Sequence, residues 1–249
     1  MDWIDRYAYS NRLRFVHPGQ KLGLALLVII LCLALDRPLV GLLAAGWMTL
    51  LAVAWARLPL RAFGGAVLAE GLFLAWAVVG VAVSVRAGEG GSWPLALRVT
   101  PESLATALRL FARALGSATA MAFLAFTTPL VDLLDLGRRV GVPPLLLDLA
   151  TLIYRFTFTL LDSLERMVTA QETRLGYADM RRSMSSAALV ASRLFIETYL
   201  RSQRLQTALE GRGYAGDLRV LPGEYRRSRP AWLFSAALAL SLLAVWGLA

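Results

Sequence analysis

Five long apolar segments separate the charged residues of this 249-residue chain, and they constrain its fold more than any other feature. A helix needs about 20 residues to cross a bilayer, because each residue advances it by about 1.5 Å. Apolar residues make up 57% of the chain and charged residues only 17%, which argues against a water-soluble domain. The sequence therefore predicts an all-α, polytopic membrane protein with about five transmembrane helices, at residues 20–35, 39–56, 62–85, 104–127 and 231–249.

The first apolar segment, residues 22–35, is shorter than a bilayer requires. The sequence Asp36-Arg37-Pro38 follows it and is typical of a tight turn, after which a longer apolar run begins. We therefore interpret the first two spans as a hairpin whose first arm includes flanking residues. The predicted organisation is an N-terminal transmembrane region at 1–127, a cytoplasmic region of long amphipathic helices at 128–230, and a final span at 231–249.

Basic residues outnumber acidic ones by 26 to 17, and Lys21 is the only lysine among them. Cytoplasmic loops of membrane proteins carry an excess of such residues. With the N-terminus in the cytoplasm, five spans place 21 of the 26 on that side, so the charge requires no nucleic-acid partner. Asp5 and Arg6 precede the first apolar run, so no cleaved signal peptide is expected. The sequence predicts a multi-pass protein of a bacterial plasma (inner) membrane with a cytoplasmic N-terminus.

His17 and Cys32 are the only histidine and the only cysteine. One of each cannot build a disulfide framework, and a Cys/His metal site or a Ser-His-Asp triad is not expected from so few ligands. We therefore predict no catalytic residues, no metal site and no bound cofactor in this chain.

Three charged residues, Glu70, Arg109 and Arg113, lie inside predicted spans. Such residues are candidates for a functional site by default. A single carboxylate without further ligands makes a poor cation site, however. We favour a structural interpretation, in which Glu70 forms an ion pair with Arg109 or Arg113 or the arginines extend to the outer surface.

A short motif occurs twice in the region 128–230. Residues 169–179 read TAQETRLGYAD, and residues 207–217 read TALEGRGYAGD. Thr, Ala, Glu and Arg agree at a constant offset of 38, and Gly-Tyr-Ala then matches after a shift of one residue. The candidate docking residues are Glu172, Arg174 and Gly176 in the first copy and Glu210, Arg212 and Gly213 in the second.

Each copy follows a long helical pattern, and its glycine is expected to end the helix in the left-handed conformation. Arg174 and Arg212 are then in or just beyond the last turns, where the helix dipole favours a cation. Simple capping accounts for a basic residue at each end. It does not account for the recurrence of the surrounding residues, which favours a docking element that is used twice.

The second motif ends a helix predicted from about residue 185 to residue 212, on the order of 40 Å long. At 100° per residue one polar stripe runs along it, and the remaining arc is largely apolar. The predicted partner is the preceding helix, from about residue 144 to residue 174, and a short amphipathic helix at 129–141 precedes both. The stripe consists of Arg193, Glu197, Arg201, Arg204 and Arg212.

With these motifs, the chain resembles the transmembrane (T) components of energy-coupling factor transporters, which import vitamins and metals in the ATP-binding-cassette class. The shared features are two arginine motifs at the ends of long cytoplasmic helices, four spans before them and one after. Asp5-Arg6-Tyr7 and the segment from Pro18 to Lys21 also agree. Within the family the chain is most similar to CbiQ, the T component of cobalt importers.

The resemblance implies a subunit that is not itself an enzyme. Two cytoplasmic ATPase subunits would use ATP and bind Arg174 and Arg212 in acidic grooves, and the long helices would act as levers on a small substrate-binding membrane subunit. Glycines 64, 65, 71 and 80 of the third span would allow close packing against that subunit. The substrate would be cobalt or nickel, with biotin or another vitamin as the alternative, and a metal would be bound by the substrate-binding subunit.

Two departures from the family pattern are His17 before Pro18, and Thr173 and Leu175 around Arg174, where small residues are commoner. Two other interpretations stay open. One is a stand-alone secondary transporter or channel, although such proteins usually carry repeats within the membrane. The other is a membrane scaffold that binds a soluble partner through the same arginines.

Overall fold

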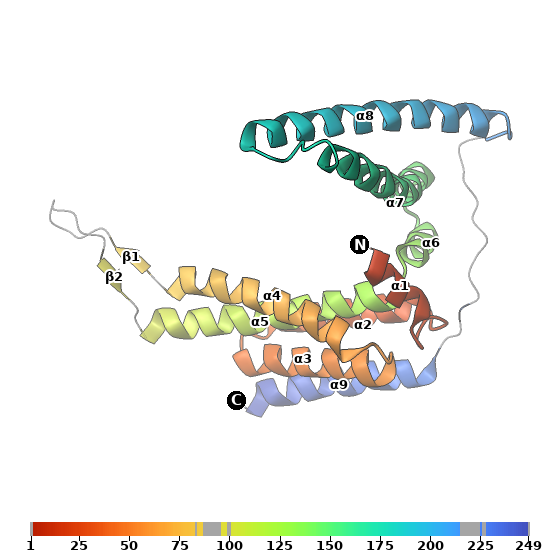
Figure 1. Ribbon diagram of the computed structural model, residues 1–249. Helices are drawn as coiled ribbons and strands as arrows, with labels where there is room; N and C mark the ends of the chain where they lie inside the picture. Colours follow the sequence, from red (N-terminus) through yellow and green to blue (C-terminus); the bar gives the residue numbers. More distant parts are fainter. Residues whose placement is uncertain are drawn as a thin grey trace. The chain divides into compact units, whose positions relative to one another are not determined.

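The computed structural model describes residues 2–82, 84–86, 96–98, 101–214, 225 and 228–248. Almost all of these residues lie in helices (Figure 1). The chain divides into two compact units, the first comprising Met1–Leu133 and Gly223–Ala249 and the second Leu134–Pro222. Each unit is described by itself.

Most described residues of the first unit lie in six α-helices and one π-helical turn. Prolines stand in the first turns of four of these helices, where the missing N–H has no helical partner to lose. The elements are α1 (Asp2–Ser10), α2 (Pro18–Ala34), α3 (Pro38–Leu50), its π-helical continuation η1 (Leu51–Trp55), α4 (Leu60–Ala82), α5 (Pro101–Thr127) and α9 (Arg229–Leu248).

Five helices of the described residues are long and apolar enough to cross a membrane, which confirms the predicted fold class. Four of them coincide with predicted spans. The span predicted at 20–35 is the shorter apolar helix α2, and the fifth candidate is α7 (Pro144–Glu172), which the sequence had placed in the cytoplasmic region. α7 qualifies by length and composition because its first half is rich in leucine. The four are Pro38–Trp55, Leu60–Gly80, Pro101–Thr127 and Pro230–Gly247.

A short β-hairpin lies between α4 and α5. Its strands β1 (Ser84–Arg86) and β2 (Ala96–Arg98) are antiparallel, with Ser84 opposite Arg98. The third span was predicted to continue to residue 85, but α4 ends at Ala82 and the chain then extends into β1.

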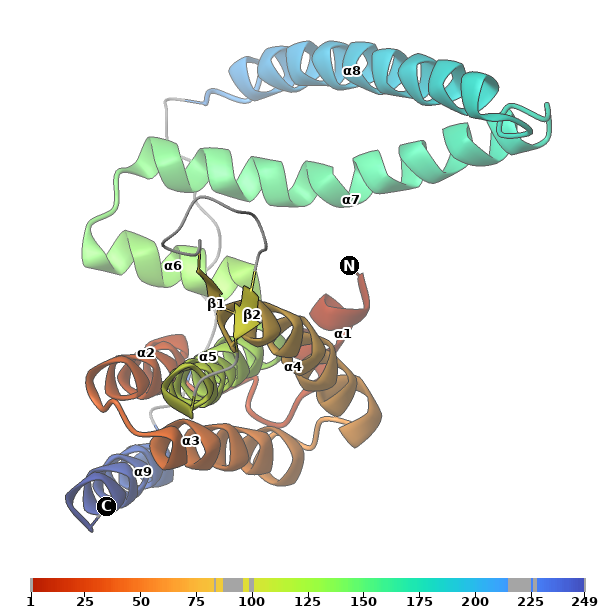
Figure 2. The same cartoon turned by 90° about the vertical axis from the view of Figure 1, so that its left-hand side faces the viewer.

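The helix α5 is the centre of the first unit, and it contacts α1, α2, α3 and α4. Figure 2 shows it end-on between α2, α3 and α4. Two glycines allow the closest approach: a Cβ on Gly41 of α3 would collide with the backbone carbonyl of Ala112, and one on Gly116 of α5 would lie 2.7 Å from the carbonyl oxygen of Gly41. The two backbones therefore touch without intervening side chains.

The apolar core lies around these helices and includes the final helix α9. Leu238 and Leu242 of α9 are fully buried in the same cluster as Met48 of α3. Phe63 and Phe126 add an edge-to-face ring contact of 5.6 Å between α4 and α5. The last span, far away in sequence, is thus part of the N-terminal bundle.

Polar side chains cap the C-terminal end of α5. Lys21 Nζ donates a hydrogen bond of 2.8 Å to the carbonyl oxygen of Thr127, and Asn11 Nδ2 donates to the same oxygen over 3.2 Å. These bonds satisfy a carbonyl that has no partner within its helix. His17 accepts a bond from the backbone N–H of Gly19 and so caps the start of α2. The segment from residue 17 to Lys21 therefore has a structural role.

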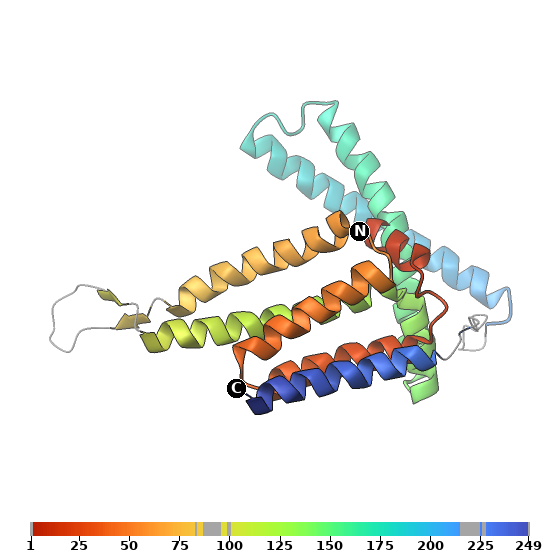
Figure 3. The same cartoon turned by 90° about the horizontal axis from the view of Figure 1, so that it is seen from below.

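The second unit contains most of α6 (Leu130–Val140), the long helix α7 (Pro144–Glu172) and the longer helix α8 (Met180–Glu210). α7 and α8 cross each other (Figure 3). Both were predicted, but α8 begins five residues earlier than expected. Its start is set by Asp179, whose carboxylate accepts a bond from the N–H of Arg182.

Candidate coupling site

The two copies of the motif form helix ends with the same hydrogen-bond pattern, one after α7 and one after α8. After α7, the amides of Arg174 and Gly176 both donate to the carbonyl oxygen of Gln171, over 3.1 and 2.8 Å. After α8, the amides of Arg212 and Tyr214 both donate to the carbonyl oxygen of Leu209, over 3.0 Å each. The offset of 38 residues therefore holds through the whole turn, and the one-residue shift suggested by Gly-Tyr-Ala has no structural counterpart.

The residue that ends each helix in the left-handed conformation differs from the prediction at the first site. Gly213 has φ 73°, as expected for the second site. At the first site the equivalent residue is Leu175, with φ 57°, and the prediction that Gly176 has this role is wrong. A side chain in this conformation costs roughly 1–2 kcal/mol, so the turn of the first copy is formed against a local preference.

Position 176 requires a glycine because of close packing and not because of its backbone conformation. A Cβ at this position would lie 2.5 Å from Ser186 Oγ and 2.9 Å from the carbonyl oxygen of Gln171. Ser186, near the start of α8, donates a hydrogen bond of 2.9 Å to the carbonyl oxygen of Gly176. The glycine thus lets the turn after Arg174 pack directly on α8.

The two arginines are presented in the same way. Arg174 and Arg212 are both exposed, and neither guanidinium makes an ion pair or a side-chain hydrogen bond with any residue that the structure describes. Glu172 is exposed as well, and Glu210 accepts a bond of 3.0 Å from Gln206, one turn earlier. Each motif therefore offers a free cationic fork beside an acidic side chain that its own arginine does not use.

A shallow hollow of 480 Å³ lies on α7 at the start of the first motif. Thr169 and Ala170, which are part of the repeat, line it. Asp162, Glu165 and Arg166 add charges of both signs. The sequence around Arg174 thus forms a concave polar surface as well as a helix end.

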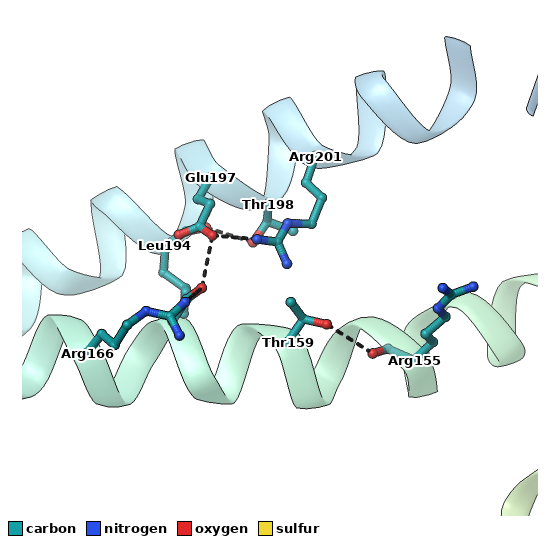
Figure 4. Close-up of polar contacts among 8 residues, drawn as sticks. Arg155, Thr159, Arg166, Leu194, Glu197, Thr198 and Arg201 are labelled. Carbon is teal, nitrogen blue, oxygen red and sulfur yellow. Dashed lines mark hydrogen bonds and ion pairs between the residues drawn. The ribbon is translucent and has the colours of Figure 1, made fainter. Parts of the chain in front are cut away.

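A polar cluster joins α7 to α8 (Figure 4). Glu197 of α8 accepts hydrogen bonds from Ser163 of α7, over 2.9 Å, and from Arg201, over 2.8 Å. Arg166 donates to Ser163 Oγ over 3.0 Å, and Ser163 is only 2% exposed. Glu197 and Arg201 belong to the predicted polar stripe, so part of that stripe faces α7 rather than solvent.

The segment that follows Arg212 is held by a second group of polar contacts, centred on Asp148, which we call the Asp148 anchor. Asp148, near the start of α7, forms an ion pair of 2.7 Å with Arg138 of α6, and its side chain is only 3% exposed. Its other carboxylate oxygen accepts a bond of 3.3 Å from the hydroxyl group of Tyr214. Tyr177, the tyrosine that follows Arg174 in the first copy, is 37% exposed and has no such contact. The turn after Arg174 is thus held by Ser186, and the turn after Arg212 by Asp148.

Asp148 lies outside the motifs and the polar stripe predicted from the sequence. It is the one charged residue within an otherwise apolar stretch at the start of the helix, residues 144–154. A charge in that position is the signal that points to a partner, because a buried carboxylate is stable only when it is paired.

The predicted ion pair inside the membrane is not formed among the described residues. Arg109 lies 3.7 Å from Asp36, in the turn between α2 and α3, and it also donates to Thr106. Glu70 instead shares a groove with Met121, twelve residues beyond Arg109 on α5 and so roughly 18 Å away along the helix. The distance along α5 explains why the two charges do not meet.

Arg113 is partly buried and also forms no ion pair with a described residue. One carboxylate oxygen of Glu70 is covered by protein and has no hydrogen-bond partner in the described part of the chain. Within that part, no group of three or more His, Cys, Asp or Glu side chains is placed to hold a metal ion.

Comparison with known proteins identifies the family of the chain. Residues 10–222 match the family CbiQ, described as cobalt transport protein. The cobalt transport protein CbiQ of Rhodobacter capsulatus is 38% identical over 167 residues, which cover 67% of this chain and 65% of that protein. CbiQ of Salmonella typhimurium is 30% identical over 238 residues, 88% of this chain and 100% of that protein.

A longer relative contains the counterpart of nearly the whole chain. The putative fused cobalt transport protein CbiMQ of Methanocorpusculum labreanum is 28% identical over 253 residues, which cover 98% of this chain but 41% of that protein. The resemblance found in the sequence is confirmed by these matches. The chain belongs to the CbiQ family of cobalt transport proteins, as a multi-pass, non-catalytic membrane component.

Proposed function

We propose that this protein couples ATP hydrolysis by two cytoplasmic ATPase subunits to cobalt import, and that Arg174 and Arg212 are the points of coupling. The observation that carries the proposal is the structural repeat. Two helix ends with the same hydrogen bonds each present an exposed arginine that no described residue binds.

The spacing of the two motifs suits two separate partners. Arg174 belongs to the turn before α8 and Arg212 to the turn after it, and the 31 residues of α8 extend over about 45 Å. Each arginine would enter an acidic groove on one ATPase subunit. Arginine suits this role because its planar guanidinium group stays charged and can bind a carboxylate through two parallel hydrogen bonds.

Motion at the two ends would be transmitted by the crossing helices. The cluster around Ser163 and Glu197 joins α7 to α8, and Asp148 connects Tyr214, after the second helix end, to Arg138 of α6. When the ATPase subunits approach or separate, the arginine-bearing ends are displaced together with these contacts. The helices then act as levers on the membrane part of the importer.

The transported ion would be bound by a different subunit. With one histidine and one cysteine, this chain has few of the ligands that cobalt or nickel prefers. Fusion of a CbiQ-like segment to a second cobalt transport segment in the M. labreanum relative supports a membrane partner that contacts this chain. We assign the binding of cobalt to such a substrate-binding subunit.

The topology that fits this function has the N-terminus and both arginine motifs in the cytoplasm. It follows from α2, α3, α4, α5 and α9 crossing the membrane, with α7 outside the hydrocarbon core. The buried pair of Asp148 with Arg138 and the polar contacts with α8 support this position of α7, because such groups are costly in lipid.

The test is charge reversal in the complete transporter, expressed with its ATPase and substrate-binding subunits. Arg174→Glu and Arg212→Glu should each reduce ATP-dependent cobalt uptake, and the double variant should abolish it and lose the ATPase subunits on purification. Arg193→Glu is the matched control, because this exposed arginine lies on α8 away from both ends. Its uptake should equal that of the wild type.

Three results would contradict the proposal. Wild-type uptake in the double variant would remove the arginines from the mechanism. Cobalt uptake by the chain alone, without ATPase subunits, would indicate a secondary transporter or channel. If the ATPase subunits bind this chain but uptake of cobalt, nickel or biotin does not depend on it, the chain would be a membrane scaffold and not a transport subunit.

A further inference from the structure

A groove of 640 Å³ lies on the first unit, between α4, α5 and α1. Small residues form much of its surface, and they allow the backbone of another helix to approach closely. They are Ala62, Gly65, Ala66 and Ala69 on α4 and Ala122 and Ala125 on α5.

Glu70 lines this groove at the middle of the apolar stretch Leu60–Gly80. Its Oε2 atom is covered and has no hydrogen-bond partner among the described residues. Arg61 also lines the groove, but it lies nine residues from Glu70 on α4, which separates their Cα atoms by roughly 13 Å along the helix, and no ion pair joins the two side chains. A carboxyl group at membrane depth needs a hydrogen-bond donor, and the described part of this chain does not supply one.

The face of α4 that carries the groove is open. A Cβ on Gly65 would have no atom within 4 Å. Phe73 and Trp76, two and three turns further along this face, are 74% and 78% exposed. Space beside the small residues is thus followed by a large apolar contact area, and together they suit a helix that lies along α4.

We infer that this groove receives a transmembrane helix of the substrate-binding subunit, with small residues at the contact and a basic or amide side chain that donates to Glu70. The inference rests on the proposed function, which supplies that subunit. Charge complementarity selects the occupant. An acyl chain would fill the space but has no donor for Glu70, and an anionic phosphate would not pair with a carboxyl group.

Two glycines in open space make a matched test in the complete transporter. Gly65→Leu fills the groove, whereas Gly46→Leu adds the same side chain on α3, at a residue that does not line the groove and that also has no atom within 4 Å of an added Cβ. Both variants are purified through the ATPase subunits, and the amount of substrate-binding subunit retained is measured. We expect Gly65→Leu to reduce retention at least about tenfold and Gly46→Leu to leave it unchanged.

Glu70→Leu is the second variant, and it decides the question if a glycine variant does not accumulate. Leucine is compatible with the membrane, so the chain should still insert, while loss of one interhelical hydrogen bond should reduce retention about threefold. Wild-type retention in Gly65→Leu or Glu70→Leu would overturn the inference. Loss of a bound phospholipid in native mass spectrometry, without loss of the subunit, would also overturn it. Failure of the ATPase subunits to bind the wild type would instead contradict the proposed function.

Discussion

Loss of the Tyr214 hydroxyl group should loosen the end of α8 that presents Arg212. Tyr214→Phe keeps the ring but removes the bond of 3.3 Å to Asp148. A hydrogen bond to a charged acceptor contributes about 1.5 kcal/mol or more at good geometry, and this longer one about 1 kcal/mol. A change of 1 kcal/mol alters an opening equilibrium about fivefold, so the amides near the end of α8 should exchange with deuterium about five times faster.

The structure provides a control in the other copy of the motif. Tyr177→Phe alters an exposed tyrosine whose hydroxyl group makes no hydrogen bond with any residue that the structure describes, so exchange around Arg174 should not change. Uptake should separate the two variants as well. Tyr214→Phe should transport less cobalt per ATP hydrolysed, because Arg212 is held less firmly, and Tyr177→Phe should match the wild type.

Arg138→Ala tests the same anchor from the side of α6. Removing one partner of a fully buried ion pair costs about 3–5 kcal/mol. Arg138 is 25% exposed, which reduces the expected loss of unfolding free energy to about 1–3 kcal/mol. Arg139→Ala breaks an exposed pair with Asp135 and should cost less than about 1 kcal/mol.

Hydrogen exchange and thermal unfolding of the complete transporter would measure these effects. The reasoning is refuted if Tyr214→Phe and Tyr177→Phe exchange alike, or if Arg138→Ala is no less stable than Arg139→Ala. A double variant of Arg138 and Tyr214 should lose less than the two single variants together, since both residues act on one carboxylate.

Three further predictions follow from single positions. Leu175→Gly should stabilise the end of α7 by about 1 kcal/mol and Gly213→Ala should destabilise that of α8 by a similar amount, because both positions have positive φ; local hydrogen exchange would show opposite changes. Gly41→Ala should lower the yield of folded protein, because a Cβ there would collide with α5, whereas Gly46→Ala, in open space on the same helix, should not. Glu197→Ala should weaken the contact between α7 and α8 and reduce uptake while the ATPase subunits still bind, which co-purification would test.

Much of the fold could be predicted because membrane spans are a local property. Each needs only enough consecutive apolar residues to satisfy the length of the bilayer, and the spans of α3, α4, α5 and α9 were found in this way. Two points were harder to predict: where α2 begins and ends, and whether the apolar helix α7 crosses the membrane. Both depend on which helices lie beside α2 and α7, and this information is not contained in a window of twenty residues.

The helix ends at the candidate site show the same division. Repetition at an offset of 38 located both arginines, since identical local sequences form similar turns. The left-handed residue of the first turn could not be assigned, because a nearby glycine was the better local choice. In the structure Leu175 takes this conformation, and Gly176 packs against Ser186 of α8.

The sequence by itself determined that this chain is a helical membrane protein and where the two arginines of its repeated motif lie. Apolar length, charge asymmetry and repetition are all properties of neighbouring residues. Only the tertiary structure decided the partners of the charged groups: Asp36 for Arg109, Asp148 for Arg138, and none among the described residues for the covered oxygen of Glu70. The physical reason is that an ion pair depends on distances of a few ångströms between helices, which follow from packing and not from spacing along the chain.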